Sequence, residues 1–329
     1  MFAIELAGTD ERFAVAEAKT AATDVSLIGE GLATCSSLNS TRFSGLAFTH
    51  CASKVIAQTS PTIHDAKTAL RDKCVDRDGT VAVRARNIHS TLEIDTQNVE
   101  DILGEVLTDA GYEVDLDSPD NELRVLFTQS YENDAGICIL GWAENRPTRD
   151  FHLRQPSDRP FFQPGSMDPA LARAVVNFAG AAPNTTLLDP MCGTGGLLIE
   201  AGLLGATALG CDVQWEMTTG ARQNLSHYLD SSDFGIFQSD VRALPICEGT
   251  IDSIVFDAPY GRQSKITGTT LPRLIESALQ ESHRLTSHVV MVGDQSWKNI
   301  ATTVGWTVDE IFERRVHRSL TRYIHILSH

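Results

Sequence analysis

The sequence predicts an α/β fold: a mostly parallel sheet of seven strands, closed by an antiparallel C-terminal hairpin and preceded by a smaller α+β region. Two observations carry this prediction. After a polar, proline-rich segment at 145–160, short β-like runs alternate with helical stretches, the pattern of a parallel sheet buried on both faces. The last two β-like runs, 306–316 and 322–327, have only a short connection between them and are expected to pair antiparallel.

The region before the polar segment mixes strands and helices. Residues 81–85 and 123–127 are short β-like runs. Residues 99–110 have helical spacing of apolar side chains, and Gly111 stands where a helix commonly ends. The polar residues from 145 onward resemble an interdomain linker in composition. We therefore expect a separate α+β part in front of the parallel sheet.

The region after the linker repeats strand and helix in a regular order. A helix is expected over 171–178, stopped at Gly180. Five β-like runs follow, at 186–189, 208–213, 236–240, 251–257 and 288–293. Because parallel strands end at the same edge of a sheet, side chains that follow these runs are expected to lie close together.

The composition bounds the class of protein. The 329 residues are 42% hydrophobic, enough for two or three globular domains. No apolar run approaches the roughly 20 residues that cross a bilayer, and residues 1–10 show no signal-peptide pattern. The seven cysteines include no C-x-x-C pair, so no zinc or other metal site is expected. Scattered cysteines fit a reducing cytosol, and a cytoplasmic location is expected.

The charge has two interpretations. The net charge is −16, with 25 Asp and 18 Glu against 21 Arg and only 6 Lys. One interpretation is an acidic protein that binds no nucleic acid, because such binding profits from a positive field. The other is a protein of a halophilic source, where molar salt cuts the Debye length to about 3 Å. The excess of Asp and scarcity of Lys favour the second interpretation, so the net charge does not exclude RNA.

The strongest local pattern is a glycine-rich turn between a strand and a helix. Residues 187–197 read LLDPMCGTGGL, with the helix expected to open at Leu197. This is neither the G-x-G-x-x-G dinucleotide motif nor a P-loop. Asp189 stands before the glycines, and its negative charge would repel a pyrophosphate but suits the cationic methionine end of S-adenosyl-L-methionine. S-adenosyl-L-methionine is therefore the expected cofactor, and this turn contributes the candidates Asp189, Met191, Gly193 and Gly195.

Acidic residues also follow the next two strands. Asp212 comes 23 residues after Asp189, where an acid typically accepts hydrogen bonds from ribose hydroxyls. Asp240 follows the third strand and can accept from the adenine amino group. Each aspartate alone is as readily a helix N-cap or turn residue, but three acids at one sheet edge favour adenosyl binding. Val213 and Val241, next in the chain, are included among the cofactor-binding candidates.

The fourth strand ends in Asp257-Ala258-Pro259-Tyr260, a pattern that indicates amine methylation. The amine of a base is a poor nucleophile, and the Asp257 carboxylate and a backbone carbonyl at Pro259 can accept its two N–H groups and orient its lone pair. Tyr260 offers a face for stacking. We expect these three residues to be catalytic, with Asp257 also close to the cofactor. An ordinary proline β-turn is the alternative. Residues 261–270, rich in Gly, Ser and Thr, are a candidate loop over the base.

Together these motifs resemble those of the Rossmann-like RNA N2-guanine methyltransferases. Residues 163–173 resemble the motif that precedes the first strand in those enzymes. Residues 315–323, RVHRSLTRY, resemble the C-terminal signature of archaeal tRNA guanine-10 N2 methyltransferases. The resemblance implies a Rossmann-like class I methyltransferase domain that adds one or two methyl groups to the exocyclic N2 amine of guanine, at position 10 of tRNA. Ala258 departs from the family, where a second proline or a leucine is common, and little effect is expected.

The N-terminal half resembles a THUMP domain, the RNA-binding module of that family, at residues 79–86 and 114–125. This implies a ferredoxin-like domain over 1–50, a THUMP domain over 51–144, a linker over 145–160 and the methyltransferase domain over 161–329. It also implies tRNA as a partner. Some members of the family it resembles depend on a small zinc-containing activator protein, so such a second partner is a hypothesis here. The RNA-binding candidates are Arg84, Arg86, Arg315, Arg318 and Arg322, whose guanidinium groups suit phosphates. For the last three, a solvated edge hairpin is the alternative.

Other functions remain open at this point. D-P-P-Y-type tetrapeptides also serve enzymes that methylate adenine in DNA, although the THUMP-like half speaks against that. An N2-guanine methyltransferase for another tRNA or rRNA position, or a non-catalytic RNA-binding protein with a degenerate methyltransferase fold, are further alternatives. The intact acids argue against the latter. A THUMP-bearing sulfur transferase is not favoured, because no S-G-G-x-D-S loop is present.

Overall fold

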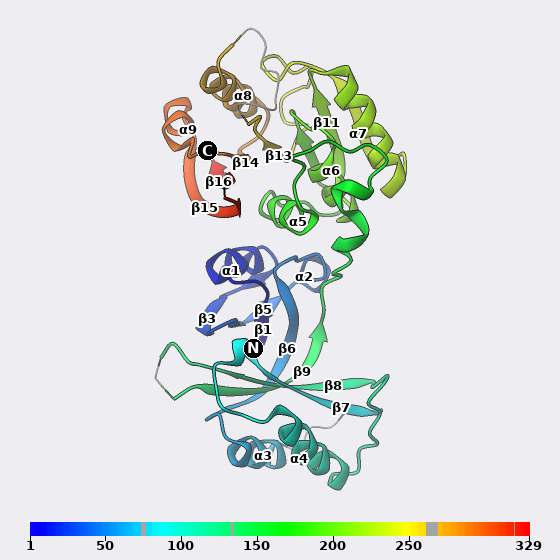
Figure 1. The fold of residues 1–329 in the computed structure, drawn as a ribbon, viewed down its shortest axis with the longest axis vertical. Coiled ribbons are helices and arrows are strands. Elements are labelled where there is room, and N and C mark those ends of the chain that lie inside the picture. The colour runs from blue at the N-terminus through cyan, green and yellow to red at the C-terminus, as the bar shows by residue number, and fades with distance from the viewer. Residues whose placement is uncertain (74–76, 133–134, 261–268, 319) are drawn as a thin grey trace. The chain divides into compact units, whose positions relative to one another are not determined.

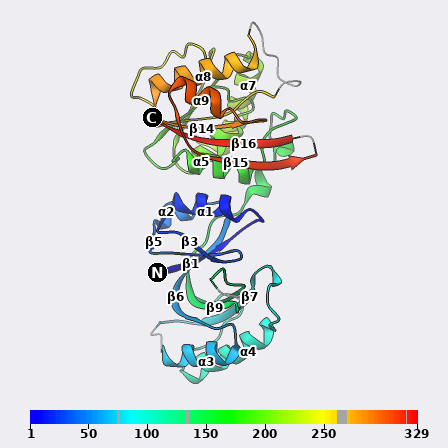
Figure 2. The ribbon, with the colours of Figure 1, turned by 90° about the vertical axis from the view of Figure 1, so that its left-hand side faces the viewer.

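The computed structural model describes residues 1–73, 77–132, 135–260, 269–318 and 320–329. These form two compact units, Met1–Thr148 and Arg149–His329, each with its own sheet (Figures 1 and 2). The boundary falls inside the segment at 145–160 that the sequence predicts as a linker. Across the described residues, no helix combines the length and the apolar character that crossing a membrane requires.

The first unit is built on one seven-stranded sheet with the order β3-β4-β1-β6-β9-β8-β7. Only β7 and β8 run parallel. The strands are β1 (Phe2–Leu6), β3 (Ser26–Gly29), β4 (Leu32–Cys35), β6 (Thr49–Thr59), β7 (Val81–Asn87), β8 (Asn121–Thr128) and β9 (Ile137–Asn145). A two-stranded sheet of β2 (Ala22–Thr23) and β5 (Ser37–Leu38) lies apart from it. The domain boundary expected at residue 50 falls within β6, which pairs with β1 on one side and β9 on the other.

Helices cover the sheet of the first unit. They are α1 (Glu11–Lys19), α2 (Ser40–Phe43), α3 (Ile63–Asp72) and α4 (Thr96–Asp109), with a short 3-10 turn at Ile88–Ser90. Helix α4, expected from the apolar spacing, begins after Asp95, whose side chain accepts the Gln97 and Asn98 N–H groups. Helices α3 and α4 pack side by side on β7, β8 and β9 (Figure 2). Residues of these strands that alternate with the core positions, such as Arg84 and Arg124, belong to the opposite face.

The second unit has a seven-stranded sheet with the order β12-β11-β10-β13-β14-β16-β15. The first five are parallel, and β16 pairs antiparallel with both β14 and β15, as the sequence predicts for the closing hairpin. The strands are β10 (Thr186–Asp189), β11 (Thr207–Asp212), β12 (Phe234–Gln238), β13 (Ser253–Asp257), β14 (His288–Gly293), β15 (Thr307–His317) and β16 (Leu320–Ser328).

Helices lie on both faces of this second sheet, which explains why the central residues of β13 and β14, 254–256 and 289–292, are all apolar. The helices are α5 (Pro169–Phe178), α6 (Gly196–Leu203), α7 (Trp215–Tyr228), α8 (Leu271–Leu285) and α9 (Lys298–Val304). Helices α8 and α9 form a core with Phe256 and Met291, and α5 lies on the other side (Figure 2). There the Phe178 ring stacks on Phe312, with centroids 5.6 Å apart. The carboxyl ends of four adjacent parallel strands are thereby left at one edge.

Candidate active site

A cavity of about 480 Å³ lies at the carboxyl edge of the second sheet. The structure brings all four predicted acids to its wall, from the ends of β10, β11 and β13 and from the turn after β12. Its wall includes these residues singled out from the sequence: Asp189, Met191, Gly193, Asp212, Val213, Asp240, Val241, Asp257, Pro259 and Tyr260. Gly195 is not in the wall, and its role is in the turn that opens α6.

The glycine-rich turn has two residues in the left-handed region. Gly193 has φ +51° and Gly195 has φ +79°, conformations that favour glycine. A Cβ on Gly195 would lie 2.5 Å from Leu225 Cδ1, whereas a Cβ on Gly193 would meet no atom within 4 Å. Gly195 therefore allows α7 to pack closely, and Gly193 keeps space open beside the cavity. Helix α6 begins at Gly196, one residue earlier than expected.

Asp189 is a buried carboxylate at the bottom of the turn. It is 2% exposed, and its Oδ1 accepts the Met191 N–H at 3.0 Å. Burial raises the pKa of Asp189 well above its usual range, and the neighbouring Asp212 and Asp257 raise it further. A cationic group bound beside Asp189 would stabilise the ionised carboxylate. This fits a sulfonium or ammonium group better than a phosphate.

Asp212 and Asp240 have different surroundings. Asp212 accepts the Gln214 N–H at Oδ1 (2.9 Å) and the Gly193 N–H at Oδ2 (3.1 Å), which fixes its carboxylate against the glycine turn. Burial raises the pKa of Asp212. Asp240 is more exposed, and Arg242 Nε donates to both of its oxygens at 2.9 and 3.0 Å. That hydrogen bonding lowers the pKa of Asp240, which is therefore held as an acceptor.

The end of β13 presents Asp257 to the cavity. The Ala258 N–H donates to Val292 O on β14 at 2.8 Å, which anchors the turn. The Tyr260 hydroxyl donates to Asp257 Oδ1. Burial raises the pKa of Asp257 to about 6, although Arg322 and the Tyr260 hydrogen bond both act to lower it. Burial raises the pKa of Tyr260 as well, so its hydroxyl stays protonated and donates.

The side chain of Arg322 has surroundings that the sequence did not predict. A contact with an RNA phosphate was expected, but the residue is 3% exposed and its guanidinium lies beside Asp257 at the carboxyl end of β13. Arg322 Nε donates to Tyr260 Oη at 3.1 Å, and its Nη2 donates to Gly165 O at 3.0 Å and lies 3.6 Å from Asp257 Oδ2. These partners differ from the RNA phosphate that was predicted.

Residues 163–167 form a part of the cavity wall that sequence reasoning did not assign to the site. Ser166 Oγ lies 3.2 Å from Thr194 Oγ1 of the glycine turn. Gly165 has φ +91° and provides the carbonyl that Arg322 binds. The signal was available, because this stretch stood out as a motif ahead of the first strand. The motif was recognised only as a whole, however, and no role in the site was assigned to its polar residues Ser166 and Asp168.

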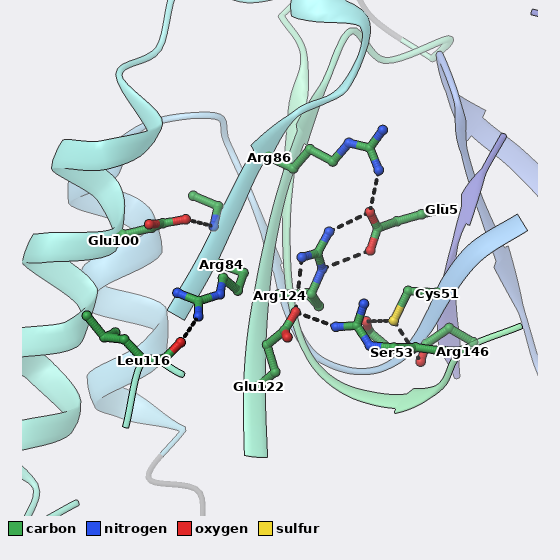
Figure 3. A network of polar contacts seen from close by, with 12 residues as sticks. Glu5, Cys51, Ser53, Arg84, Arg86, Glu100, Leu116, Glu122, Arg124 and Arg146 are labelled. Atoms are coloured by element: carbon green, nitrogen blue, oxygen red, sulfur yellow. Dashed lines mark hydrogen bonds and ion pairs between the residues drawn. The ribbon is translucent and has the colours of Figure 1, made fainter. Parts of the chain in front are cut away.

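The other RNA-binding candidates lie in both units. Arg84 and Arg86 belong to β7, where Arg84 donates to Leu116 O and Arg86 Nη1 lies 3.2 Å from Glu5 Oε2 (Figure 3). The Arg86 side chain is still 42% exposed. In the second unit Arg315 lies on β15 and Arg318 follows it, and both are exposed.

Part of the predicted site lies outside the described residues. This applies to 261–268, most of the segment suggested as a loop over the base. Cys192, adjacent to the turn, is buried, and burial raises the pKa of its thiol well above the usual range. In the part of the chain that the structure describes, no group of three or more His, Cys, Asp or Glu residues is placed to hold a metal ion.

Comparison with known families agrees with this geometry. Residues 156–324 match the family described as RMKL-like, methyltransferase domain, and residues 63–131 match the THUMP domain. The fold and the site thus define a methyltransferase with a Rossmann-like sheet and a THUMP domain. The acidic residues that line its cavity fit S-adenosylmethionine, the methyl donor of such enzymes. The chain belongs to the family of the tRNA (guanine(10)-N2)-dimethyltransferases.

Three relatives support this membership. The tRNA (guanine(10)-N2)-dimethyltransferase of Methanothermobacter thermautotrophicus is 32% identical over 86% of this chain and 83% of its own length. Those of Pyrococcus abyssi and Methanocaldococcus jannaschii are 33% and 30% identical, over 76% and 77% of this chain and 74% and 71% of their own lengths. Among solved structures, TrmN from Thermus thermophilus is similar with a TM-score of 0.50, 21% identity and coverage of 99% and 98% of the two chains, which supports the fold.

Proposed function

We propose that this enzyme methylates the exocyclic N2 amine of guanine 10 in tRNA, adding two methyl groups in succession. The observation that carries the proposal is the position of Asp257, Pro259 and Tyr260 in the same cavity wall as the glycine turn. The relatives named above carry this activity in their names. A U6 snRNA (guanine-N(2))-methyltransferase of Mus musculus is 28% identical over only 53% of this chain and 30% of its own length, which supports guanine N2 chemistry but not that substrate.

Three acids divide the recognition of the cofactor among them. Asp189 faces the cationic methionine end, Asp212 is oriented by two backbone N–H groups toward the ribose hydroxyls, and Asp240 is kept ionised by Arg242 toward the adenine amine. When bound, S-adenosylmethionine supplies an electrophilic methyl group on a sulfonium. Gly193 leaves the space that a ligand beside the turn needs.

The residues at the end of β13 act on the guanine. Asp257 and the Pro259 carbonyl accept the two N–H groups of the amine, and this directs the nitrogen lone pair toward the methyl group. Tyr260 stacks on the base, a contact worth about 1–3 kcal/mol per base in comparable sites. After transfer the nitrogen bears a positive charge and releases a proton, which the Asp257 carboxylate can accept because its pKa is near 6.

The proposal is tested with unmodified tRNA and isotopically labelled cofactor at high salt, with the methylated base mapped by mass spectrometry. We expect singly and then doubly methylated guanine at position 10, and no product on a tRNA with adenine at that position. Asp257→Ala should abolish transfer while equilibrium dialysis still detects cofactor binding. Methylation at a different nucleotide, or turnover by the Asp257→Ala protein, would contradict the assignment.

Exposed arginines of the hairpin and partly exposed arginines of the first unit are proposed to contact the tRNA backbone. Arg315 and Arg318 on the hairpin, and Arg84 and Arg86 in the THUMP region, present guanidinium groups that suit phosphates. Replacing Arg315 and Arg318 together by Gln should weaken tRNA binding and lower the slope of log K against log salt by about 1–2. An unchanged slope would remove the hairpin from the interface.

The surroundings of the enzyme are also proposed. The net charge of −16 with only 6 Lys supports a cytoplasm of high salt, such as that of a halophilic archaeon. The family resemblance supports a small zinc-containing activator as an additional partner. Full activity of the purified enzyme, with no further gain on adding cell extract, would rule that partner out.

A further inference from the structure

Arg322 joins three segments that are distant in sequence. It lies on β16, and its guanidinium binds the Gly165 carbonyl ahead of α5, the Tyr260 hydroxyl after β13 and, at 3.6 Å, the Asp257 carboxylate. Its Cζ is also 5.8 Å from the centroid of the Tyr260 ring. A buried guanidinium retains its charge, so its contacts to an ionised partner are stronger than at a surface.

These contacts fix the direction of one proton. A tyrosine hydroxyl has a single proton to donate, and here it points to Asp257 Oδ1. Arg322 Nε donates to the same phenolic oxygen and so occupies its acceptor side. With Gly165 holding the other end of the guanidinium, the hydroxyl is restricted to the orientation that meets the carboxylate. Tyr260 thereby takes the place that an N–H of the substrate amine would take on Oδ1.

We propose that Arg322 is a positioning residue that holds the Tyr260 hydroxyl on the Asp257 carboxylate and keeps that carboxylate ionised until an amine replaces the hydroxyl. The inference rests on the proposed function for its substrate. Its geometric part concerns residues of this chain alone. In this role Arg322 contacts no substrate and acts through Asp257 and Tyr260.

The charges around Asp257 decide the expected effect. Burial raises the pKa of Asp257, Arg322 is the cation that lowers it, Tyr260 lowers it through the hydrogen bond, and the acid Asp294 raises it. Asp168 faces Arg322 in turn. Without the guanidinium, burial and Asp294 would raise the pKa of Asp257 with less opposition. An opposite charge at this range commonly shifts a carboxyl pKa by about 1–3 units.

The first experiment measures Asp257 directly by NMR titration of the ¹³C carboxyl of labelled, substrate-free protein, with the Asp257→Asn protein used to assign the signal. We expect a pKa about one unit higher or more in Arg322→Gln than in the wild type. Lys298→Gln, which removes one positive charge from an exposed residue of α9, should leave that pKa unchanged. An unshifted Asp257 in folded Arg322→Gln would overturn the proposal.

The second experiment uses kinetics and separates the inference from the proposed function. In the pH profile of kcat/KM, the apparent pKa on the acidic side should rise in Arg322→Gln by the same amount as the pKa measured by NMR. Arg322→Lys should keep this apparent pKa near that of the wild type, because the positive charge remains. It should lower kcat, because an ammonium group does not reproduce the paired guanidinium hydrogen bonds to Gly165 and Tyr260. If Arg322→Gln does not fold, an unchanged kcat in Arg322→Lys would overturn the proposal. If the wild type methylates no guanine, but the Asp257 pKa is still higher in Arg322→Gln than in the wild type, only the proposed function is overturned.

Discussion

At the scale of single residues, the candidate site is defined by carboxylates, and burying a carboxylate costs stability. Asp189 is the clearest example, because its pKa is raised well above the usual range although its carboxylate accepts a hydrogen bond from the Met191 N–H. A carboxyl whose folded-state pKa lies above its unfolded value destabilises the folded protein at neutral pH, and this effect disappears as the pH falls through the folded pKa. The proposed role in cofactor recognition and the stability of the fold therefore make opposite demands on this residue.

Asp189→Asn should separate these demands. The amide oxygen can still accept the Met191 N–H while the buried charge is gone, so we expect a higher midpoint of thermal unfolding at pH 7, by roughly 2–4 °C for about 1 kcal/mol. The gain should shrink as the pH is lowered. Cofactor affinity, measured by calorimetry, should fall. A lower unfolding midpoint at pH 7 would show that the ionised carboxylate stabilises the turn.

Sequence reasoning selected these acids because each lies at or just after the end of a strand, and neighbouring parallel strands end at one edge. It did not find the role of Arg322. The alternation along 320–328 shows only that every second residue faces one side, and Arg322 stands among other arginines in the chain. Its partners Gly165 and Tyr260 lie 157 and 62 residues away. Contacts across such separations depend on the register between β16 and β14, which no local pattern contains.

At the scale of elements, the glycine turn before α6 combines two different requirements. Gly195→Ala would place a Cβ 2.5 Å from Leu225 Cδ1 in a left-handed conformation, so it should destabilise the packing of α6 on α7 by about 1–3 kcal/mol. Gly193→Ala meets no protein atom, so its cost to stability should be closer to 1 kcal/mol.

Chemical denaturation and cofactor titration of both variants check this pair. Gly193→Ala should lose more cofactor affinity per unit of lost stability, because its added methyl group projects beside the cavity. Equal losses of stability in the two variants would argue against the assigned contacts.

The elements of the second unit follow from the sequence almost in full. Runs such as 251–257 and 288–293 have an unbroken apolar centre, at 254–256 and 289–292, which predicts buried parallel strands. The first unit was predicted less completely. Its β1 pairs with β6, about 45 residues further on, and β3 and β4 are only four residues long. Short strands with distant partners leave little periodic signal.

At the scale of the whole molecule, Glu5 ties the beginning of the chain to the THUMP region. It is 1% exposed and accepts Arg124 Nε at 2.9 Å and Arg124 Nη2 at 2.6 Å, while Arg86 binds it at 3.2 Å (Figure 3). Glu5→Gln should destabilise the protein by up to about 3–5 kcal/mol. The loss should be smaller to the extent that the remaining ion pair with Glu122 stabilises Arg124. Glu144→Gln, which breaks a partly exposed pair with Arg77, should have an effect below about 1 kcal/mol in the same urea titration.

The continuous sheet of the first unit leads to a second expectation. A fragment of residues 51–148 lacks β1, β3 and β4 and leaves the edge of β6 without its partner. It should not unfold cooperatively, whereas a fragment of residues 1–148 should. Circular dichroism during thermal unfolding distinguishes the two, and a cooperative transition of the shorter fragment would establish residues 1–50 as a separate domain.

The charge of −16 also acts on the whole molecule. Repulsion among acidic side chains destabilises the folded state at low ionic strength and is screened when the Debye length falls to about 3 Å. We expect the unfolding midpoint to rise steeply between 0.1 M and 1 M KCl, at pH 7. Sucrose, which does not screen charge, should produce a smaller rise. A midpoint that is independent of KCl would argue against adaptation to salt.

The position of β16 between β14 and β15 affects how the protein matures during synthesis. The glycine turn and the acids at the first strand tips are all made before residue 260, so a nascent chain can form a binding surface for the cofactor early. Arg322, which we propose to orient Tyr260, is made only with β16. A ribosome stalled before β16 would therefore carry a chain that has the proposed cofactor-binding residues but lacks a fixed acceptor side, and we expect catalytic competence only after β16 has been translated.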